Sequence, residues 1–268
     1  MLLAIDTGNT NTIFAVFDNQ GEKICDWRCK TIPGRTADEY AVWLDPLFAR
    51  ENLSFTNIND IIVSSVVPDS NFNIRTLGEK YFDLCPVILG AQKVETGLEI
   101  DLEKPEELGA DRIVNSIAAI EKYGAPCIVL DFGTATTFDI INDKAVYCGG
   151  AIAPGVNLSV EALYNAAAQL PIINLQRPES VVGRDTVSAL QSGLYWGYVA
   201  MIEGMIRRFR DELSFTKAPK VIATGGLASL FANDIKEISV IDDNLTLDGL
   251  AIIHDRTLAM SRKNIKTA

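Results

Sequence analysis

The chain carries one short pattern twice, and this repeat decides the fold class. The first copy reads Ala4-Ile-Asp-Thr-Gly-Asn-Thr-Asn-Thr12, and the second reads Val129-Leu-Asp-Phe-Gly-Thr-Ala-Thr-Thr137. The Asp, the Gly and the last Thr coincide at a constant offset of 125 residues, and Asp18 matches Asp143 at the same offset. Each copy predicts a buried strand, a polar turn and a returning antiparallel strand.

Apolar runs and helical spacings alternate around both copies. We expect strands at 2–5, 12–17, 23–28, 61–67, 86–89, 127–130, 138–141 and 220–223, and helices at 36–50, 71–83, 112–123, 159–168, 187–213 and from 247 onward. The glycines around 149–150 and 155 are interpreted as loop residues. A repeat at about half the chain length predicts two similar α/β lobes, the first over 1–115 and the second over 116–268.

Composition excludes several classes of protein. The 268 residues are long for one core, and 24 basic against 35 acidic side chains leave a net charge of −11. Such a chain repels nucleic acids and anionic lipids, so we expect neither as a partner. No segment approaches the ~18 apolar residues that span a bilayer, and the N-terminus lacks signal-peptide features, which predicts a cytoplasmic protein.

Cysteine and histidine spacing predicts no metal centre or nucleophilic triad. Cys25 and Cys29 have no second cysteine pair and no nearby histidine to complete a zinc site. His254 is the only histidine and lies in an apolar stretch, where a structural role is the commoner one.

The two Asp-x-Gly turns are suited to polyphosphate. Glycine lets the backbone approach a ligand closely, and successive N–H groups form an anion-binding concavity to which Thr and Asn side chains add hydrogen bonds. The Asp would act through a cation or its water, because a carboxylate repels phosphate. The alternative is a pair of ordinary polar hairpins. The second copy favours the phosphate interpretation.

Two other segments are candidates for binding. Thr224-Gly-Gly226 follows an apolar strand and suits a flat ligand such as adenine or its ribose, although a tight strand–helix junction explains it nearly as well. Gly109-Ala-Asp-Arg112 opens a helix, where the helix dipole and the Arg fork favour an anion. Spacing alone favours the simpler interpretation that Asp111 caps the helix and Arg112 is solvated.

Seven motifs in order along the chain closely resemble type III pantothenate kinase: DTGNTNT (6–12), SSVVP (64–68), GADRIVN (109–115), DFGTATTFD (131–139), GGAIAPG (149–155), SVVGRDTVSALQSG (180–193) and ATGGLA (223–228). The resemblance covers residues 1 to about 250. It implies the duplicated ribonuclease-H-like lobes (actin-like ATPase fold) of the acetate kinase, sugar kinase, Hsp70 and actin superfamily, with a cleft between them. It also implies ATP-dependent phosphorylation of pantothenate to 4′-phosphopantothenate, the first step of coenzyme A synthesis.

The resemblance implies a role for each matching residue. Asp111 would accept the proton of the substrate hydroxyl, Asp6 would lie near Mg²⁺ through water, and Asp131 would hold K⁺ or NH₄⁺. The implied ATP contacts are Asp6, Thr7, Gly8, Asn9, Thr10, Asn11, Thr12, Ile13, Gly133, Thr134, Gly225 and Gly226. The implied substrate contacts are Leu102, Gly109, Ala110, Asp111, Arg112 and Thr186, the last delivered from the partner subunit of a homodimer.

Two positions depart from the family pattern. Leu102 stands where the family has a substrate-binding Tyr, which puts the pantothenate affinity in doubt, and Ala15 replaces a Gly with little expected effect. Two alternatives therefore stay open, a non-catalytic regulatory relative and a kinase for another small alcohol. The apolar positions and glycines of 187–213 are explained by a core helix of one domain, but the homodimer that the resemblance implies favours a subunit interface. Because both turns begin with Asp, ATP binding is expected to require cations strictly.

Overall fold

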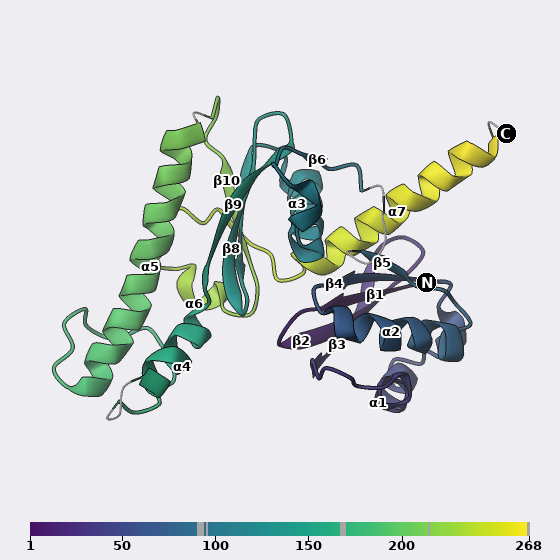
Figure 1. Cartoon of the computed structure of the whole chain (residues 1–268), viewed down its shortest axis with the longest axis horizontal. Helices are drawn as coiled ribbons and strands as arrows, with labels where there is room; N and C mark the ends of the chain where they lie inside the picture. The colour runs from purple at the N-terminus through teal and green to yellow at the C-terminus, as the bar shows by residue number, and fades with distance from the viewer. Residues whose placement is uncertain (90–93, 95, 167–169, 214, 267–268) are drawn as a thin grey trace. The chain divides into compact units, whose positions relative to one another are not determined.

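The computed structural model describes residues 1–89, 94, 96–166, 170–213 and 215–266, with 260–266 described by their backbone alone. It divides into two compact units (Figure 1). Unit 1 comprises 1–98, 106–118 and 245–268, and unit 2 comprises 99–105 and 119–244. The predicted lobe boundary at 115/116 falls inside helix α3 (Ala110–Tyr123). The C-terminal helix, which the predicted boundary assigns to the second lobe, belongs to unit 1.

Unit 1 is built on a five-stranded sheet in the order β3-β2-β1-β4-β5. The strands are β1 (Leu2–Thr7), β2 (Asn11–Phe17), β3 (Lys23–Lys30), β4 (Asp60–Ser65) and β5 (Val87–Leu89). β2 is antiparallel to both of its neighbours, β1 and β3, whereas β4 and β5 are parallel to β1. This arrangement confirms the predicted strand, turn and returning strand of the first copy.

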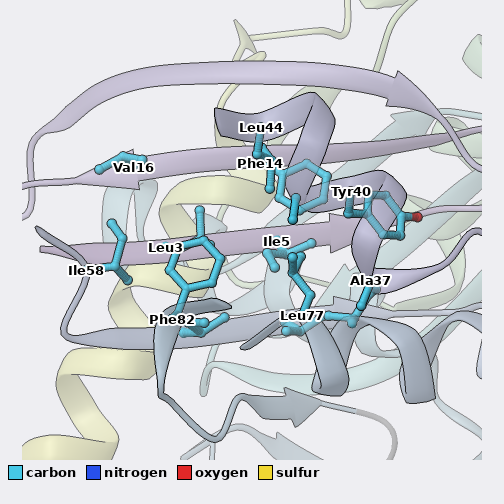
Figure 2. Packing of buried hydrophobic residues seen from close by; sticks show 14 of the residues in the cluster. Leu3, Ile5, Phe14, Val16, Ala37, Tyr40, Leu44, Ile58, Leu77 and Phe82 are labelled. Carbon is cyan, nitrogen blue, oxygen red and sulfur yellow. The ribbon is translucent and has the colours of Figure 1, made fainter. Parts of the chain in front are cut away.

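One face of this sheet packs against helices α1 (Ala37–Arg50) and α2 (Pro68–Leu77). Figure 2 shows Leu3, Ile5 and Phe14 pointing into the same core as Tyr40 and Leu44 of α1. Thr36 begins α1 with a capping box, since its hydroxyl accepts from the Glu39 N–H and the Glu39 carboxylate accepts from the Thr36 N–H. Short 3-10 or π turns follow at Phe55–Asn57, Gly78–Phe82 and Pro105–Glu107.

The other face of the sheet is covered by the first part of α3 and by α7 (Leu245–Lys266). Leu2 and Ala4 pack there with Val114, Leu250 and Ile253. A Cβ on Gly249 would lie 2.4 Å from the Val114 carbonyl oxygen, so this glycine brings the two helices into backbone contact. α7 therefore belongs to unit 1 although it is the last element of the chain.

Unit 2 repeats the topology of unit 1. Its sheet order is β11-β10-β7-β8-β9-β6, and a single extra strand, β6, extends the same five-strand arrangement. The strands are β6 (Glu99–Ile100), β7 (Cys127–Phe132), β8 (Ala135–Ile141), β9 (Val146–Pro154), β10 (Lys220–Thr224) and β11 (Val240–Ile241). The helices are α4 (Val156–Ala166), α5 (Thr186–Leu213) and α6 (Ala228–Phe231), and α5 lies alongside the sheet (Figure 1).

Several boundaries differ from expectation. Gly149 and Gly150 lie within β9 and not in a loop, because glycine-rich β9 has little of the apolar alternation that marks a strand. The helix expected at 71–83 begins earlier, at Pro68, since proline suits a first helical turn. The helix expected at 159–168 begins at Val156, and positions 167–168 lie outside the described residues.

The two hairpins match strand for strand, but their turns differ in length. β1 and β7 share one burial pattern, and β2 and β8 share another. Thr12 pairs with Thr7, whereas Thr136 pairs with Phe132, so the structural counterpart of Thr12 is Thr136 and not Thr137. The second turn is one residue shorter, so the structural counterparts after the turn are one position earlier than the constant offset predicts.

The same shift changes the partner of Asp18. The Asp18 carboxylate accepts from the N–H groups of Gln20 and Glu22, and the Asn142 side chain accepts equivalently from Lys144 and Val146. Asn142 is therefore its counterpart, while Asp143 accepts hydrogen bonds from Thr216. The constant offset holds only up to the glycine of each turn.

Candidate active site

The first Asp-x-Gly turn, residues 8–10 of unit 1, is held in place by hydrogen bonds to Thr31. The Thr31 hydroxyl donates to the Gly8 carbonyl at 2.7 Å and lies 2.9 Å from the Thr12 hydroxyl. The Thr31 N–H donates to the Thr10 carbonyl at 2.9 Å. Sequence reasoning missed Thr31. Asn11 of β2 pairs with Lys30 of β3, and this register places the following residue, Thr31, at the turn. The register of β2 and β3 could not be derived from the sequence pattern.

Asp6 lies at the end of β1, in register with Ser64 of β4. Burial raises the pKa of the Asp6 carboxyl to about 7, and the negative charge of Asp111 acts in the same direction. The Ser64 hydroxyl and the charge of Arg28 lower this pKa and only partly oppose the shift. Two carboxyl groups thus share an environment that disfavours their ionisation without a cation.

Asp111 lies in the first turn of α3, also in unit 1. Its Oδ1 accepts from the Arg112 N–H at 2.8 Å, and the Gly109 carbonyl accepts the first helical hydrogen bond from Ile113. Gly109 therefore occupies the capping position and Asp111 follows it within the helix. Burial raises the pKa of the Asp111 carboxyl, against the opposing effects of the Arg112 N–H and charge. A Cβ on Gly109 would lie 2.6 Å from Asp111 Oδ1, so the glycine makes room for that carboxylate.

The second Asp-x-Gly turn, residues 133–134 of unit 2, is fixed in a similar way. The Gly133 N–H donates to the Ala135 carbonyl at 3.1 Å, and the Thr136 hydroxyl is hydrogen-bonded to Tyr198 of α5. Gly133 and Thr134 are exposed, and Asp131 is half-buried at the end of β7. The Tyr198 hydroxyl therefore bonds to Thr136 in the second hairpin as the Thr31 hydroxyl bonds to Thr12 in the first.

Gly225 and Gly155 both press against this second turn. Gly225 has φ +90°, and a Cβ there would lie 2.5 Å from Asp131 Oδ1 and 2.7 Å from the Phe132 nitrogen. The Gly155 N–H donates to the Thr134 carbonyl at 3.1 Å. The structure therefore brings Asp131, Gly133, Thr134 and Gly225 together within unit 2. Gly155 is a loop residue between β9 and α4, as expected, and it is part of the same cluster.

Gly225→Ala should destabilise unit 2 by about 2–3 kcal/mol and weaken nucleotide binding. An alanine is strained at the left-handed φ of this position, and its Cβ would clash with Asp131 and Phe132 of β7. Gly226→Ala is the matched control, since nothing lies within 4 Å of a Cβ at that exposed neighbour. Urea unfolding of both variants measures the difference. Equal stability of the two variants would contradict the assigned close approach.

The remaining expected substrate residues lie in unit 2. Leu102 packs near Gly149 of β9, with its Cδ2 3.6 Å from the position of a Cβ on that glycine. Thr186 is exposed at the first position of α5 and lines an apolar groove with Leu163, Leu190 and Leu194. Gly109–Arg112 are in unit 1, so the expected substrate residues are divided between the two units.

The candidate metal ligands of the site are individual carboxylates, not a preformed cluster. Within the described part of the chain, no group of three or more His, Cys, Asp or Glu side chains comes together to hold an ion. The five cysteines are free thiols. No helix among the described residues is long and apolar enough to cross a bilayer.

Two sheets of one topology, each with an Asp at the end of one strand followed by a short turn and a returning antiparallel strand, define a duplicated ribonuclease-H-like (actin-like ATPase) fold. The activator of 2-hydroxyisocaproyl-CoA dehydratase from Clostridium difficile, solved with bound ADPNP, has this fold. It superposes with a TM-score of 0.58 at 11% identity, covering 100% of this chain and 97% of its own.

Sequence comparison then defines the family. The model of the family described as type III pantothenate kinase matches residues 2–208. Curated type III pantothenate kinases from Rhodospirillum rubrum and Koribacter versatilis are 53% and 46% identical to this chain. The alignments cover 96% and 98% of this chain and 98% of each relative. The chain belongs to the type III pantothenate kinase family.

Proposed function

We propose that this protein transfers the γ-phosphoryl group of ATP to pantothenate, forming 4′-phosphopantothenate and ADP in the first step of coenzyme A synthesis. The observation that carries the proposal lies within unit 1, where the buried carboxyl Asp111 is close enough for its charge to raise the pKa of Asp6. Each unit also has its own Asp-x-Gly turn, which suits phosphate. Phosphoryl transfer needs in-line positioning and neutralisation of charge more than covalent help from the protein. Family membership supplies the identity of the acceptor.

Asp111 acts as the general base in this proposal. Burial raises the pKa of the Asp111 carboxyl, and a carboxylate with a raised pKa is a stronger base. This favours removal of the proton from the primary hydroxyl of pantothenate. Gly109, Ala110 and Arg112 bind the substrate beside it, and the planar guanidinium of Arg112 suits a carboxylate. The lack of a side chain at Gly109 leaves room for the Asp111 carboxylate in this position.

The residues at both turns fit the cations that the proposal requires. Asp6 is a buried carboxyl with a second carboxyl nearby, an arrangement that a divalent cation stabilises. A single protein carboxylate also suits Mg²⁺, which takes most of its remaining ligands from phosphates and water. Asp131 would hold K⁺ or NH₄⁺ beside the second turn. When bound, these cations neutralise the charge of the transferring phosphates.

The apolar groove around Thr186 supports a homodimer. Leu163 and Val187 are exposed large apolar side chains, and Gly193 and Gly197 on α5 have open space around them. A second subunit on this face would cover these residues and place its Thr186 on the substrate of its partner. Sedimentation at micromolar concentration tests the proposal, and a monomer would contradict it.

Leu102→Tyr should lower the KM for pantothenate about 3–10-fold with little change in kcat, because a phenol adds one hydrogen bond to the substrate. Leu102→Phe is the control that adds the ring without the hydroxyl. Steady-state kinetics with varied pantothenate measures both variants. If Phe improves KM as much as Tyr, the hydrogen-bond explanation is wrong.

A coupled ADP-release assay tests the function against both alternatives. Release that requires pantothenate and increases with potassium supports the proposal. Release only with a different small alcohol identifies a kinase with another acceptor. Absence of ADP release under every condition, together with nucleotide or pantothenate binding, identifies a non-catalytic regulator.

A further inference from the structure

One row of paired residues crosses the sheet of unit 1 and ends on an exposed arginine that none of the roles above uses. Asp6 of β1 pairs with Ile13 of β2, and Ile13 pairs with Arg28 of β3. Residues that pair directly across neighbouring strands point to the same face of a sheet. Arg28 therefore shares a face with Asp6, two strands away, at a Cα separation of about 10 Å.

The packing of the two outer strands of this row agrees with that face. On β1, Leu2 and Ala4 pack against α3 and α7, and Asp6 continues their alternation. On β3, Trp27 packs into the opposite core, the one shown in Figure 2. Its neighbour Arg28 consequently points away from that core, to the face that carries Asp6.

The Arg28 side chain is available to a ligand. It is exposed, and among the described residues it makes no hydrogen bond and no ion pair. On the same strand Lys23 is already paired, with its Nζ 2.6 Å from Asp26 Oδ1. The positive charge of Arg28 nevertheless acts on Asp6, where it lowers the pKa and opposes the effect of Asp111. A guanidinium without a partner thus lies near two carboxyl groups of the site.

The place of this row in the hairpin indicates which anion Arg28 meets. Asp6 and Ile13 flank the first Asp-x-Gly turn, residues 8–10, whose N–H groups suit phosphates. In the proposed reaction the phosphoryl group moves from this turn to the hydroxyl beside Asp111, so its oxygens pass close to this face of the sheet. Ile13, between Asp6 and Arg28, is apolar and offers these oxygens no hydrogen bond. The planar fork of an arginine binds two phosphoryl oxygens at once.

We propose that Arg28 binds the terminal phosphoryl group of the nucleotide and stabilises its negative charge during transfer. Two carboxyl groups and a triphosphate otherwise share a site on a chain with a net charge of −11. An arginine keeps its positive charge at every pH at which the protein is folded, so the protein itself contributes a cation beside the metal. The proposal rests on the proposed kinase function for the identity of the donor. Arg28 lies outside all seven motifs of the family.

Calorimetric titration of the full-length protein tests the proposal, with Mg-ADP and with the Mg complex of β,γ-imido-ATP as the two probes. The imido analogue has the terminal phosphoryl group but does not transfer it, so pantothenate is not needed. Arg28→Gln should weaken binding of the analogue about 10–100-fold, the loss of one charge-assisted contact, and should change ADP binding less than about two-fold.

Arg50→Gln is the matched control. Arg50 is also an exposed arginine of unit 1, but it lies in the last turn of α1, which packs on the opposite face of the sheet. This variant should leave both affinities unchanged. Urea unfolding of both variants should match that of the wild type, since both side chains are exposed.

Four results would overturn the inference. They are an unchanged affinity of Arg28→Gln for the analogue, an equal loss for the analogue and ADP, a loss that disappears at saturating Mg²⁺, and a loss confined to pantothenate. The third would assign the effect to the metal near Asp6, and the fourth would assign Arg28 to the carboxylate of the substrate. A wild-type protein that binds neither nucleotide would overturn the proposed function as well, so the two failures are distinguishable.

Discussion

Asp111→Asn should lower kcat about 10²–10⁴-fold, the largest effect that we expect from one side chain. The amide has the size of the carboxylate but cannot accept the proton of the substrate hydroxyl. Asp111 Oδ1 already accepts the Arg112 N–H, and an amide oxygen can keep this bond. Helix α3 should therefore begin as before, and ATP affinity measured by calorimetry should stay close to that of the wild type.

Glu106→Gln is the matched control for this variant. Glu106 is an exposed carboxylate in the short turn just before α3, and its replacement changes net charge by the same amount. It should leave kcat within about two-fold of the wild-type value. Near-normal turnover in Asp111→Asn would remove Asp111 as the base, whereas a joint loss in both variants would indicate a general charge effect.

Asp6→Asn should abolish magnesium-dependent turnover and at the same time stabilise the ligand-free protein at pH 8. The pKa of Asp6 is raised to about 7 in the folded chain, so the folded state retains a proton that the unfolded state releases near pH 4. Wild-type stability therefore falls as pH rises from about 4 to about 7, and remains lower above that range. An asparagine does not titrate, so the variant avoids this loss.

The gain should be small at pH 4.5 and should reach up to about 4 kcal/mol at pH 8. Thermal unfolding without nucleotide at the two pH values measures it. Asp45→Asn is the control, because Asp45 is an exposed carboxylate of the same unit. A stability difference that does not change with pH would show that Asp6 ionises normally. Retained turnover in Asp6→Asn would remove it from the magnesium site.

Local sequence patterns were sufficient where one strand or helix presents its own apolar face. The hairpins of both copies, helix α1 and the long helix α5 lie where the spacing predicts them. Patterns failed where a neighbour decides the structure. Glycine-rich β9 is a strand because β8 pairs with it along its length.

The site shows the same division. The motifs indicated the two Asp-containing turns and the helix start at Gly109–Arg112, since each is a short contiguous segment. Thr31 and Gly155 were missed as supports of the turns, because each reaches its turn through strand register or through close backbone approach. No residue-level pattern encodes either contact.

The sequence by itself determined that the fold is duplicated and that each half carries an Asp-x-Gly turn between two strands. Both conclusions follow from local periodicity and from a repeated motif. Only the tertiary structure decided that α7 covers the sheet of unit 1, that Asn142 and not Asp143 is the counterpart of Asp18, and that burial and the charge of Asp111 raise the pKa of Asp6. The physical reason is that burial, register and charge proximity depend on residues distant in the chain, which a linear pattern does not contain.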